Sequence, residues 1–478
     1  MAFSRQIGAY FGSYGARCLA AALLVSSAPG FAQTLSAEQQ HLRAIYQELV
    51  EINTTASVGS CTAAVSAMAA RLKTGGFSDA ELQIIVPPDG PKKGNLVARI
   101  KGSGAKKPLL LLAHVDVVEA KREDWVRDPF KLIEEDGFFY ARGSADDKSM
   151  AAVFVANLIR YKQEKFVPNR DLIIALTCEE EAGSSPFNGV EYLLKHHRPL
   201  IEAELALNEG GGGSLNKDGK PLRHGVQAGE KVFQTFILEV SNAGGHSSVP
   251  RKDNAIYHLA DGLSRLGKFD FPFKLTDTTR GFFDRVSALE PGQVGADMKA
   301  ILRSPPDVDA IARLSAAQPF YNASMRTTCV ATMINAGHAE NALPQRARGL
   351  VNCRILPGEA VDDVQKTLAR VLADEAIVIS RMGEATVSPR QPLHAELMKA
   401  VEELTSTMWP GIPVVPTMSA GATDGRFLNN NGIWTYGVSG MFNYPDGSNA
   451  HGLNEKLPVK SLYEGHQFLY ALVKKLAQ

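Results

Sequence analysis

Apolar residues recur every three to four positions over residues 37–75, and this spacing predicts helix. Leu42, Ile45, Tyr46 and Leu49 fall on one helical face, and Ala, Val and Met continue the pattern between residues 62 and 72. A second stretch with closely spaced apolar residues lies at 150–161. We therefore expect helix in both stretches.

Continuous apolar runs predict strands that are buried on both faces. One run spans residues 109–112 and ends in Ala113 and His114, and two more lie at 171–178 and 204–207. A further strand is predicted at 96–100. Strands of this kind are typical of parallel or mixed sheets covered by helices on both sides. Because helical stretches alternate with them, the predicted fold class is α/β.

The pattern changes near residue 230. It predicts a strand at 233–240, a helix at 254–266, two strands at 328–335 and 347–356, a helix at 361–373 and a strand at 377–380. This β-α-β-β-α-β order is that of the ferredoxin-like unit. The stretch 268–325 inside it is too long for a plain loop, so we expect a helical insertion there.

After residue 392 the α/β pattern resumes. It predicts a helix near 394–407, a strand at 433–438 and a closing helix at 460–476. A small domain thus interrupts a larger one. The predicted boundaries are 33–229 and 389–478 for the larger domain and 230–388 for the smaller domain.

Residues 1–32 have the composition of a secretory signal peptide. They carry Arg5 and Arg17 and no acid, an apolar run at 19–25, and the small residues Gly30 and Ala32. We expect cleavage after Ala32 and a secreted protein, in the bacterial periplasm. An uncleaved anchor is the alternative, but the run is far shorter than the roughly 20 residues that span a bilayer. The sequence predicts no later membrane span.

Charge and cysteine content exclude several classes of protein. The 478 residues contain 51 Lys and Arg against 51 Asp and Glu, so no net basic charge favours nucleic acid or an anionic membrane as a partner. Five cysteines without a CxxC pair exclude a disulfide scaffold and cysteine-rich zinc modules. Cys329 and Cys353 could face each other on a hairpin. We nevertheless expect the cysteines beyond residue 32, including Cys61 and Cys178, to be free buried thiols.

Acidic and histidine residues gather where the predicted strands end. His114-Val-Asp116 follows one buried strand, a triplet of glutamates at 179–181 follows the next, and Glu209 follows the third. In α/β sheets, ligands bind at the carboxyl ends of strands. Positions 114 and 116 share one side of an extended chain, so His114 can ligate a metal while Asp116 accepts from its other ring N–H.

Two further clusters complete a set of possible metal ligands. Asp146-Asp147 precedes a helix, and His451 lies near the C-terminus. Packed carboxylates repel one another, so three glutamates at a buried strand end are costly without cations. Two histidines and three carboxylates, one of them shared, suit two Zn²⁺ ions, with Co²⁺ or Mn²⁺ as alternatives.

These motifs, in this order, resemble one family over residues 40–475: HVD at 114–116, ADDK at 145–148, CEEEAG at 178–183, LNEGG at 207–211 and NAHGLNE at 449–455. The family is that of the co-catalytic zinc enzymes glutamate carboxypeptidase, succinyl-diaminopimelate desuccinylase, acetylornithine deacetylase, aminoacylase and carboxypeptidase S. The resemblance implies a zinc-binding mixed-sheet exopeptidase domain interrupted by a ferredoxin-like α+β lid or dimerisation domain.

The resemblance also implies roles for single residues. Glu180 matches the general base, and Asp116 stands behind the first ligand. The expected ligands are His114 and Glu209 on one zinc, Asp146 as the bridge, and Glu181 and His451 on the other zinc.

In the lid, the resemblance implies a homodimer in which His246 serves the active site of the other chain. Asn341 and Arg354 match substrate-binding residues, and Gly421 and Thr423 lie in a motif like the desuccinylase substrate loop. The chain departs from the family at Glu119, Ser149 and Met150, which affects loop shape and specificity but no ligand. The insertion at 268–325 is larger than in glutamate carboxypeptidase and resembles the carboxypeptidase S and N-acyl amino acid hydrolase branch.

The implied reaction is metal-assisted hydrolysis of an amide bond, which releases an amino acid from a small peptide or an N-acyl amino acid. Glu180 would accept the proton of water, His246 would stabilise the oxyanion, and Arg354 would pair with a substrate carboxylate. One alternative is a catalytically inactive secreted binding protein on the same scaffold. The other is a di-zinc aminopeptidase, which binds a free α-amine, and the motif around Arg354 argues against it.

Overall fold

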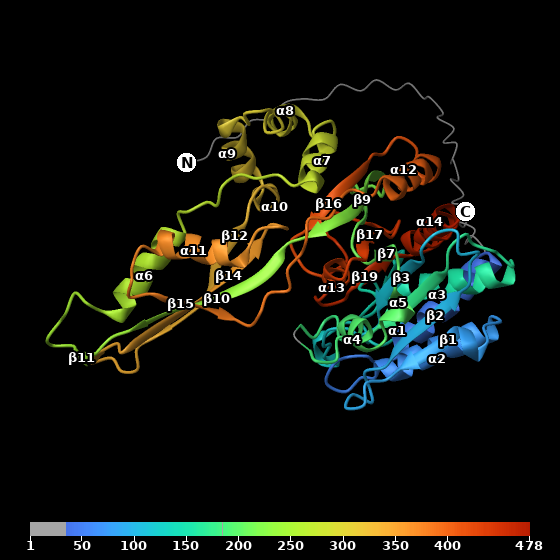
Figure 1. Ribbon diagram of the computed structural model, residues 1–478, viewed down its shortest axis with the longest axis horizontal. Coiled ribbons are helices and arrows are strands. Elements are labelled where there is room, and N and C mark those ends of the chain that lie inside the picture. The colour runs from blue at the N-terminus through green and yellow to red at the C-terminus, as the bar shows by residue number, and fades with distance from the viewer. Residues whose placement is uncertain (1–34, 184) are drawn as a thin grey trace, which may run out of the picture.

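The computed structural model describes residues 35–183 and 185–478, and Figure 1 shows their arrangement. The predicted signal peptide at 1–32 lies outside these residues. Across the described ranges, we find no helix with the length and apolar character needed to cross a membrane.

A mixed sheet of ten strands forms the larger domain. Its order is β1-β2-β6-β3-β7-β17-β9-β8-β18, and β16 pairs with β9 off this path. The four central strands β6, β3, β7 and β17 are parallel. The bounds are β1 Leu82–Ile85, β2 Asn95–Ile100, β3 Leu109–His114, β6 Leu172–Thr177, β7 Leu205–Asn208, β8 Gly212–Leu215, β9 Pro221–Glu230, β16 Val414–Ser419, β17 Trp434–Gly437 and β18 Phe442–Asn443.

Helices cover both faces of this sheet, which explains the continuous apolar runs. Along β3, Leu109 and Leu111 pack into one core while Leu110 and Leu112 pack into another. A strand between two helical layers has no solvent face, so it needs no alternation of polar residues. The helices on the first side are α1 Ala37–Glu51, α2 Cys61–Thr74, α3 Lys148–Gln163, α12 Ala395–Met408 and α14 Val459–Leu476. Those on the second side are α4 Gly189–His196, α5 Arg198–Ile201 and α13 Gly425–Asn430.

The helix predicted over 37–75 is in fact two helices. The chain leaves helical geometry after Glu51, and Thr55 pairs with Val117 in an isolated bridge. The second helix then begins with its own cap, because the Ser60 hydroxyl accepts from the N–H of Ala63. Apolar periodicity continues through both helices, so it could not reveal the break.

A second domain leaves the large sheet where β9 ends. It contains β10 Val232–Ser241, α6 Ala255–Leu266, β12 Thr328–Ala336, β14 Arg346–Ile355, α11 Val361–Leu372 and β15 Val378–Met382. These strands form an antiparallel sheet of order β12-β14-β10-β15, and α6 and α11 cover one of its faces. We call this part the inserted domain, residues 232–382. It extends away from the large sheet in Figure 1.

Four helices occupy the long stretch between α6 and β12. They are α7 Asp277–Val286, α8 Gly292–Ala300, α9 Val308–Ala317 and α10 Pro319–Ser324. Their core includes Phe282, Phe283 and, from the large sheet, Val415 of β16. Arg285 Nη1 also donates to the backbone carbonyl of Val414 at 2.6 Å. The helical insertion is therefore seated on the larger domain at β16 (Figure 1).

Five strands of the large sheet were not expected from the sequence pattern: β1, β8, β18 and, in particular, β9 and β16. β9 carries Gly225, Gln227 and Gly229, and β16 contains Pro416, all residues that weaken a strand signal. They pair in parallel, and β9 continues through Lys231 into β10. β9 and β10 thus form an almost continuous strand that connects the two domains.

The prediction of free thiols was wrong. Cys61 and Cys178 form one disulfide, and Cys329 and Cys353 form another. The second pair sits at directly facing positions of β12 and β14, as the hairpin alternative would have it. The first pair joins residues 117 positions apart, and sequence spacing gave no sign that the start of α2 meets the end of β6.

Candidate metal centre

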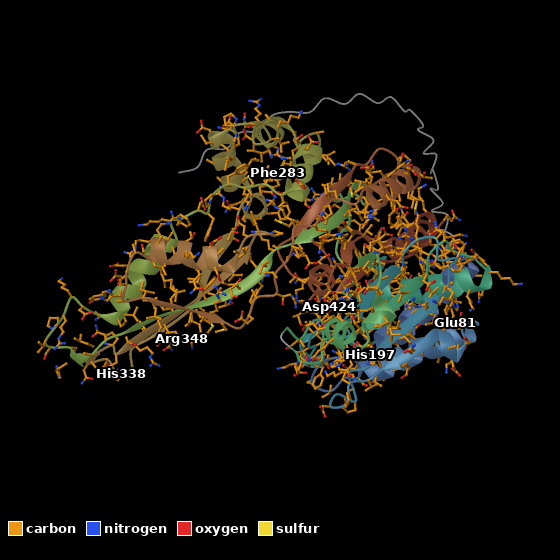
Figure 2. The ribbon with its side chains drawn as sticks, in the orientation of Figure 1. Glu81, His197, Phe283, His338, Arg348 and Asp424 are labelled. Atoms are coloured by element: carbon orange, nitrogen blue, oxygen red, sulfur yellow. A yellow bond between two sulfur atoms is a disulfide. The ribbon has the colours of Figure 1, made fainter. Side chains whose placement is uncertain are left out.

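Three neighbouring parallel strands deliver acidic and histidine residues to one edge of the large sheet. His114 is the last residue of β3, the glutamates at 179–181 follow β6, and Glu209 follows β7. Because parallel strands point the same way, their carboxyl ends meet. Asp424, labelled in Figure 2, lies in the loop that approaches this edge from the second part of the domain.

Asp146 lies between two histidines. Its Oδ1 is 3.1 Å from His114 Nε2, and its Oδ2 is 3.3 Å from His451 Nε2. His451 Nε2 is also 2.9 Å from Glu181 Oε1, and His114 Nε2 is 3.9 Å from Glu209 Oε1. The two oxygens of one carboxylate thus face two different histidines.

The ligand atoms are spaced as they are around metal ions. Those of His114, Asp146 and Glu181 lie within 4.8 Å of one another, and so do those of His114, Glu180 and Glu209. Ligands about 2 Å from one ion have this mutual spacing. Imidazole and carboxylate together, without thiolate, suit Zn²⁺, Co²⁺ or Mn²⁺. The residues at this edge therefore fit metal ions of this kind.

Electrostatics points the same way. Burial raises the pKa of Glu180 to about 9 and that of Glu181 to about 7. Burial also raises the pKa values of Asp147 and Glu209 well above their ordinary range. So many carboxyl groups at one buried place cannot all ionise in the chain alone. Divalent cations reverse this, because their charge stabilises the ionised ligands.

The two histidines hold protons that a cation would displace. Hydrogen bonding to Asp146 raises the pKa of His451 to about 9. Burial lowers the pKa of His114, but hydrogen bonds to Asp116 and Asp146 outweigh it and raise that pKa well above 6.5. In return, these two histidines lower the pKa of Asp146 despite its burial. A ligand histidine must be neutral to bind a metal, so binding releases these protons.

Asp116 contacts the glutamate loop as well as His114. His114 Nδ1 lies 3.1 Å from the backbone carbonyl of Asp116 and 3.6 Å from its carboxylate, so the carbonyl is the closer acceptor. The Asp116 carboxylate instead accepts the backbone N–H groups of Glu180 and Glu181, at 3.3 and 3.0 Å. Asp116 therefore fixes the loop that carries both glutamates as well as facing the histidine.

Glu455 supports the site, and no role was predicted for it. Its buried carboxylate accepts one hydrogen bond from a guanidinium and three from backbone N–H groups in the loop before α3: Arg142 Nη1 at 2.8 Å, Gly143 at 2.9 Å, Ala145 at 2.8 Å and Asp146 at 3.0 Å. It follows His451 by four residues in the same motif. That spacing was the available signal, because one segment can supply a ligand and hold the loop of another.

The loop between β16 and α13 contributes a further buried acid. Asp424 Oδ1 accepts from Asn188 Nδ2 at 2.6 Å, and burial raises the pKa of Asp424 to about 6. Its negative charge also contributes to the raised pKa of Glu180. Gly421 and Thr423 of this loop were predicted to bind substrate, and no role was predicted for the acid beside them.

The Thr423 side chain is buried and forms hydrogen bonds within the protein. Its hydroxyl donates to Glu230 Oε1 at 2.5 Å and accepts from Asn208 Nδ2 at 3.1 Å, and its N–H donates to Glu230 Oε2 at 2.9 Å. It therefore links the end of β7 to the end of β9. Gly421 is exposed, and its N–H donates to the Ser419 hydroxyl at 3.0 Å.

A cleft of about 630 Å³ lies between the two domains. Arg354, Lys231 and Phe233 line it from the inserted domain and its connection, and Arg426 lines it from the larger domain. Arg354 Nη1 donates to the backbone carbonyl of Ala420 at 3.0 Å, and its guanidinium lies 4.7 Å from the centre of the Phe233 ring. The cleft therefore presents two guanidinium groups, those of Arg354 and Arg426, while burial lowers the pKa of Lys231 to about 7.

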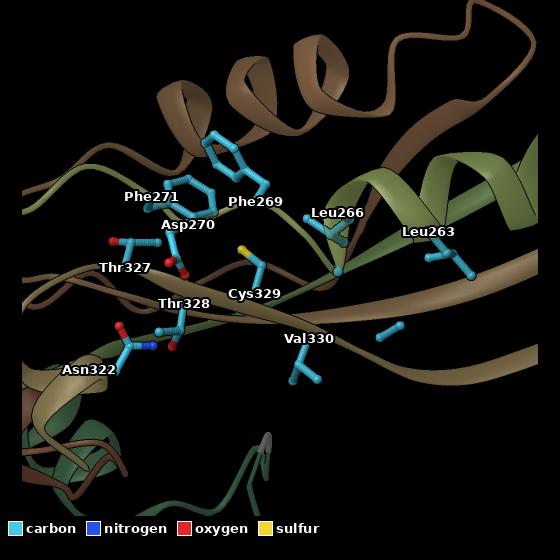
Figure 3. A pocket seen from close by; sticks show the side chains of 12 residues that line it. Leu263, Leu266, Phe269, Asp270, Phe271, Asn322, Thr327, Thr328, Cys329 and Val330 are labelled. Atoms are coloured by element: carbon cyan, nitrogen blue, oxygen red, sulfur yellow. The ribbon is translucent and has the colours of Figure 1, made fainter. Parts of the chain in front are cut away.

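A smaller pocket of about 400 Å³ lies within the inserted domain (Figure 3). Leu266, Phe269 and Phe271 line one side of it, and Cys329 and Val330 of β12 line the other. None of the residues that line it belongs to the metal-ligand cluster or to the interdomain cleft. We assign no chemistry to this pocket.

His246 and Asn341 lie together but away from the cluster. His246 ends the short strand β11 Gly245–His246, which pairs with β13 Ala342–Leu343, and the N–H of Ser247 donates to the carbonyl of Asn341 at 3.1 Å. In Figure 1, β11 marks the end of the inserted domain that is remote from the large sheet. Within one chain, the structure therefore does not bring these two residues to the metal ligands.

Comparison with known proteins agrees with this architecture. The family model described as Peptidase family M20/M25/M40 matches residues 110–475. The human N-fatty-acyl-amino acid synthase/hydrolase PM20D1 is 29% identical over 389 residues, which cover 78% of this chain and 75% of that protein.

Solved structures share the fold. The M20 family metallo-carboxypeptidase Sso-CP2 from Sulfolobus solfataricus superimposes with a TM-score of 0.63 at 22% identity, covering 92% of this chain and 99% of that chain. The YXEP protein of Bacillus subtilis, described as a dinuclear metal binding peptidase of the M20 family, gives 0.59 at 13% identity, covering 92% and 99%. The chain therefore belongs to peptidase family M20/M25/M40 and is a metal-dependent hydrolase of amide bonds.

Proposed function

We propose that the chain is a secreted di-zinc enzyme that releases an amino acid from an N-acyl amino acid or a small peptide. The observation that carries this proposal is the position of Asp146, whose two carboxylate oxygens face His114 and His451 separately. A relative named for N-fatty-acyl-amino acid hydrolysis and a structural neighbour named as a carboxypeptidase support the substrate class.

In this proposal the five ligands divide between two ions. His114 and Glu209 hold one ion, Glu181 and His451 hold the other, and Asp146 bridges them. When bound, two zinc ions supply polarisation of the scissile carbonyl and lower the pKa of water.

Glu180 is the proposed general base. Its carboxylate belongs to the same cluster as His114 and Glu209, and burial, with a smaller contribution from neighbouring acids, raises its pKa. It would accept a proton from the attacking water and deliver it to the leaving amine, the two tasks of one acid–base group. The hydrogen bond from its N–H to Asp116 holds it in place for both transfers.

The cleft supports a substrate with a free carboxylate. Arg354 offers a planar fork of donors that matches a carboxylate with two parallel hydrogen bonds. Arg426 adds a second guanidinium to the same cleft, which Glu191 and Glu384 also line. The fork of donors on Arg354, rather than the net charge of the cleft, favours a carboxylate over the free α-amine of an aminopeptidase substrate.

We further propose that two chains pair through their inserted domains, so that His246 of the partner subunit reaches the oxyanion. The edge strand β12 leaves Val330, Met333 and Ile334 at 60, 66 and 61% exposure. Exposed apolar edge strands invite pairing with another chain. The helical insertion packs against β16, and the three apolar side chains of β12 stay exposed.

The two disulfides support secretion. Disulfides persist in oxidising compartments such as the bacterial periplasm and are rare in the cytosol. The predicted signal peptide at 1–32 would direct the chain there.

The test is a panel of substrates offered to the zinc-loaded protein. Acyl amino acids with short and long chains, dipeptides, and the matching amino acid amides without a carboxylate would be compared by release of the amino acid. We expect release only where the carboxylate is free. Arg354→Ala should raise KM about tenfold or more, and Arg348→Ala on the same strand should not. Equal cleavage of the amides, or no release from any member, would contradict the proposal.

A further inference from the structure

The disulfide between Cys61 and Cys178 lies directly behind the metal centre. Cys178 is the first residue after β6, and the next three residues are Glu179, Glu180 and Glu181. Cys61 is the first residue of α2. Both cysteines are almost fully buried, at 2% and 0% exposure, and their Cα atoms are 6.0 Å apart. The bond therefore ties the start of the glutamate loop to a helix of the core.

Asp116 connects this disulfide to the ligands. One of its carboxylate oxygens and the two sulfur atoms of Cys61 and Cys178 all lie within 4.8 Å of one another. The same carboxylate accepts the N–H groups of Glu180 and Glu181. The disulfide thus lies next to the Asp116 carboxylate, which in turn holds the glutamate loop.

The loop needs such a support because sheet pairing stops just before it. The last paired position of β6 is Thr177, which faces His114. Beyond the sheet, the N–H of Cys178 donates to Asn95 Oδ1 at 3.0 Å and its carbonyl accepts the N–H of Gly189 at 2.8 Å, and Glu179 then turns the chain with a φ of 67°. A non-glycine residue in this left-handed region is held there by its surroundings.

We propose that the Cys61–Cys178 disulfide is a positioning element of the metal centre. It fixes the end of β6 so that Glu180 and Glu181 keep their hydrogen bonds to Asp116 and their side chains face the other ligands. This inference rests on the proposed roles of Glu180 as base and Glu181 as ligand. Supports of this kind around metal ligands are typically worth about 10- to 100-fold in metal affinity or activity.

The second disulfide of the chain is a matched control. Cys329 and Cys353 occupy directly facing positions of β12 and β14. The residues before and after each cysteine are also paired between these two strands, and this pairing already holds the backbone. Cys329 lines the pocket of Figure 3, which includes none of the metal ligands. Loss of this bond should leave the metal ligands where they are.

The experiment compares Cys61→Ser/Cys178→Ser with Cys329→Ser/Cys353→Ser in the full protein. Each variant is loaded with Zn²⁺ for kinetics and with Co²⁺ for absorption spectroscopy, well below its unfolding temperature. For the first pair we expect kcat to fall about tenfold or more with KM nearly unchanged, a shifted cobalt spectrum, and faster metal loss to a chelator. The control pair should match the wild type in all three.

Unaltered kcat, cobalt spectrum and metal loss in the first pair would overturn the proposal, and so would equal changes in the control pair. If the serine pair does not fold, Cys61→Ala/Cys178→Val replaces it, because apolar side chains carry no desolvation cost in the core. If the wild type cleaves no substrate, the proposed function fails, while the cobalt spectrum and the metal loss still decide the role of the disulfide.

Discussion

The carboxyl edge of the large sheet and the far end of the inserted domain carry residues that the sequence motifs assign to one active site. At the sheet edge, three parallel strands and two loops bring the groups together, and the carboxylate of Asp146 lies 3.1 Å from His114 and 3.3 Å from His451. At the far end, His246 and Asn341 sit in a two-residue strand pairing and the turn next to it, both exposed to solvent.

The difference lies in what completes each region. At the sheet edge, burial raises the pKa values of Glu180 and Glu209. Bound cations would stabilise the ionised carboxylates there. In the proposed dimer the far end is completed by the partner subunit, because within the described residues of one chain His246 and Asn341 lie away from the ligands. The first region can therefore be tested through metal content, and the second only through assembly.

The largest expected effect is at the sheet edge. Glu180→Gln should keep the full metal content and lose 10²–10⁴-fold or more in kcat, because the residue is proposed as the base and not as a ligand. Metal analysis and kcat would be measured on the same sample. Glu179→Gln is the control, since Glu179 pairs with Lys93 and Ser185 and takes no part in the proposed proton transfer.

Two results would change this assignment. A kcat near that of the wild type would remove Glu180 from the mechanism. Loss of one metal ion would mean that Glu180 is the ligand and Glu181 the base.

Asp146→Ala should lower metal content more than any other single ligand change. As a bridge it would contact both ions, whereas His451 would contact one. We expect Asp146→Ala to retain less zinc than His451→Ala after dialysis, as measured by elemental analysis. Equal retention would argue against the bridge and make Asp147 the next candidate.

A mixture of inactive chains tests the far end. If His246 serves the other subunit, chains with Glu180→Gln and chains with His246→Ala can form mixed dimers in which one site has both defects and the other has neither. Random pairing gives about a quarter of wild-type activity. The two chains would be co-expressed with different tags, so that mixed dimers can be purified.

Mixed dimers without recovered activity would rule out the shared site. A monomer in solution would do the same, and it would leave the exposed apolar residues of β12 unexplained.

The sequence predicted the sheet edge well because its chemistry is local. His114, Glu181 and Glu209 each stand next to a strand that apolar periodicity reveals, and parallel strands bring such ends together. Support from distant residues was missed. Glu455 holds the Asp146 loop across more than 300 positions, and Cys61 meets Cys178 across 117, and no periodicity encodes either contact.

The inserted domain was predicted from its element order, but β9 and β16 were not predicted at all. Both strands carry glycine, proline or polar residues that are buried in the sheet, such as Gln227 and Glu230. Their polar groups are satisfied by partners from other segments, as Glu230 is by Thr423. Buried polar residues of this kind argue against a strand when the local sequence pattern is considered alone. In the folded protein, residues from other segments supply their hydrogen bonds.

The smallest expected effect concerns a histidine of the inserted domain, whose pKa is raised by a different cause from that at the sheet edge. In the inserted domain, charged side chains form ion pairs near the surface. His258 Nδ1 lies 2.6 Å from Asp374 Oδ2, and its Nε2 lies 3.2 Å from Asp253 Oδ1. The hydrogen bond to Asp374 is the main cause of the raised pKa of His258, the reverse of the sheet edge, where burial dominates.

A pKa raised above 6.5 means that the folded state binds this proton more tightly than the unfolded state does. The stabilisation is therefore complete below about pH 6.5 and is lost as the pH rises through the raised pKa. Because the pair is partly exposed, we expect at most about 1 kcal/mol. His258→Gln should reduce the difference in unfolding free energy between about pH 6 and about pH 9 by that amount. His338→Gln, in an exposed loop of the same domain, is the control. An unchanged difference in His258→Gln would show that the surface pairs do not contribute to the stability of the inserted domain.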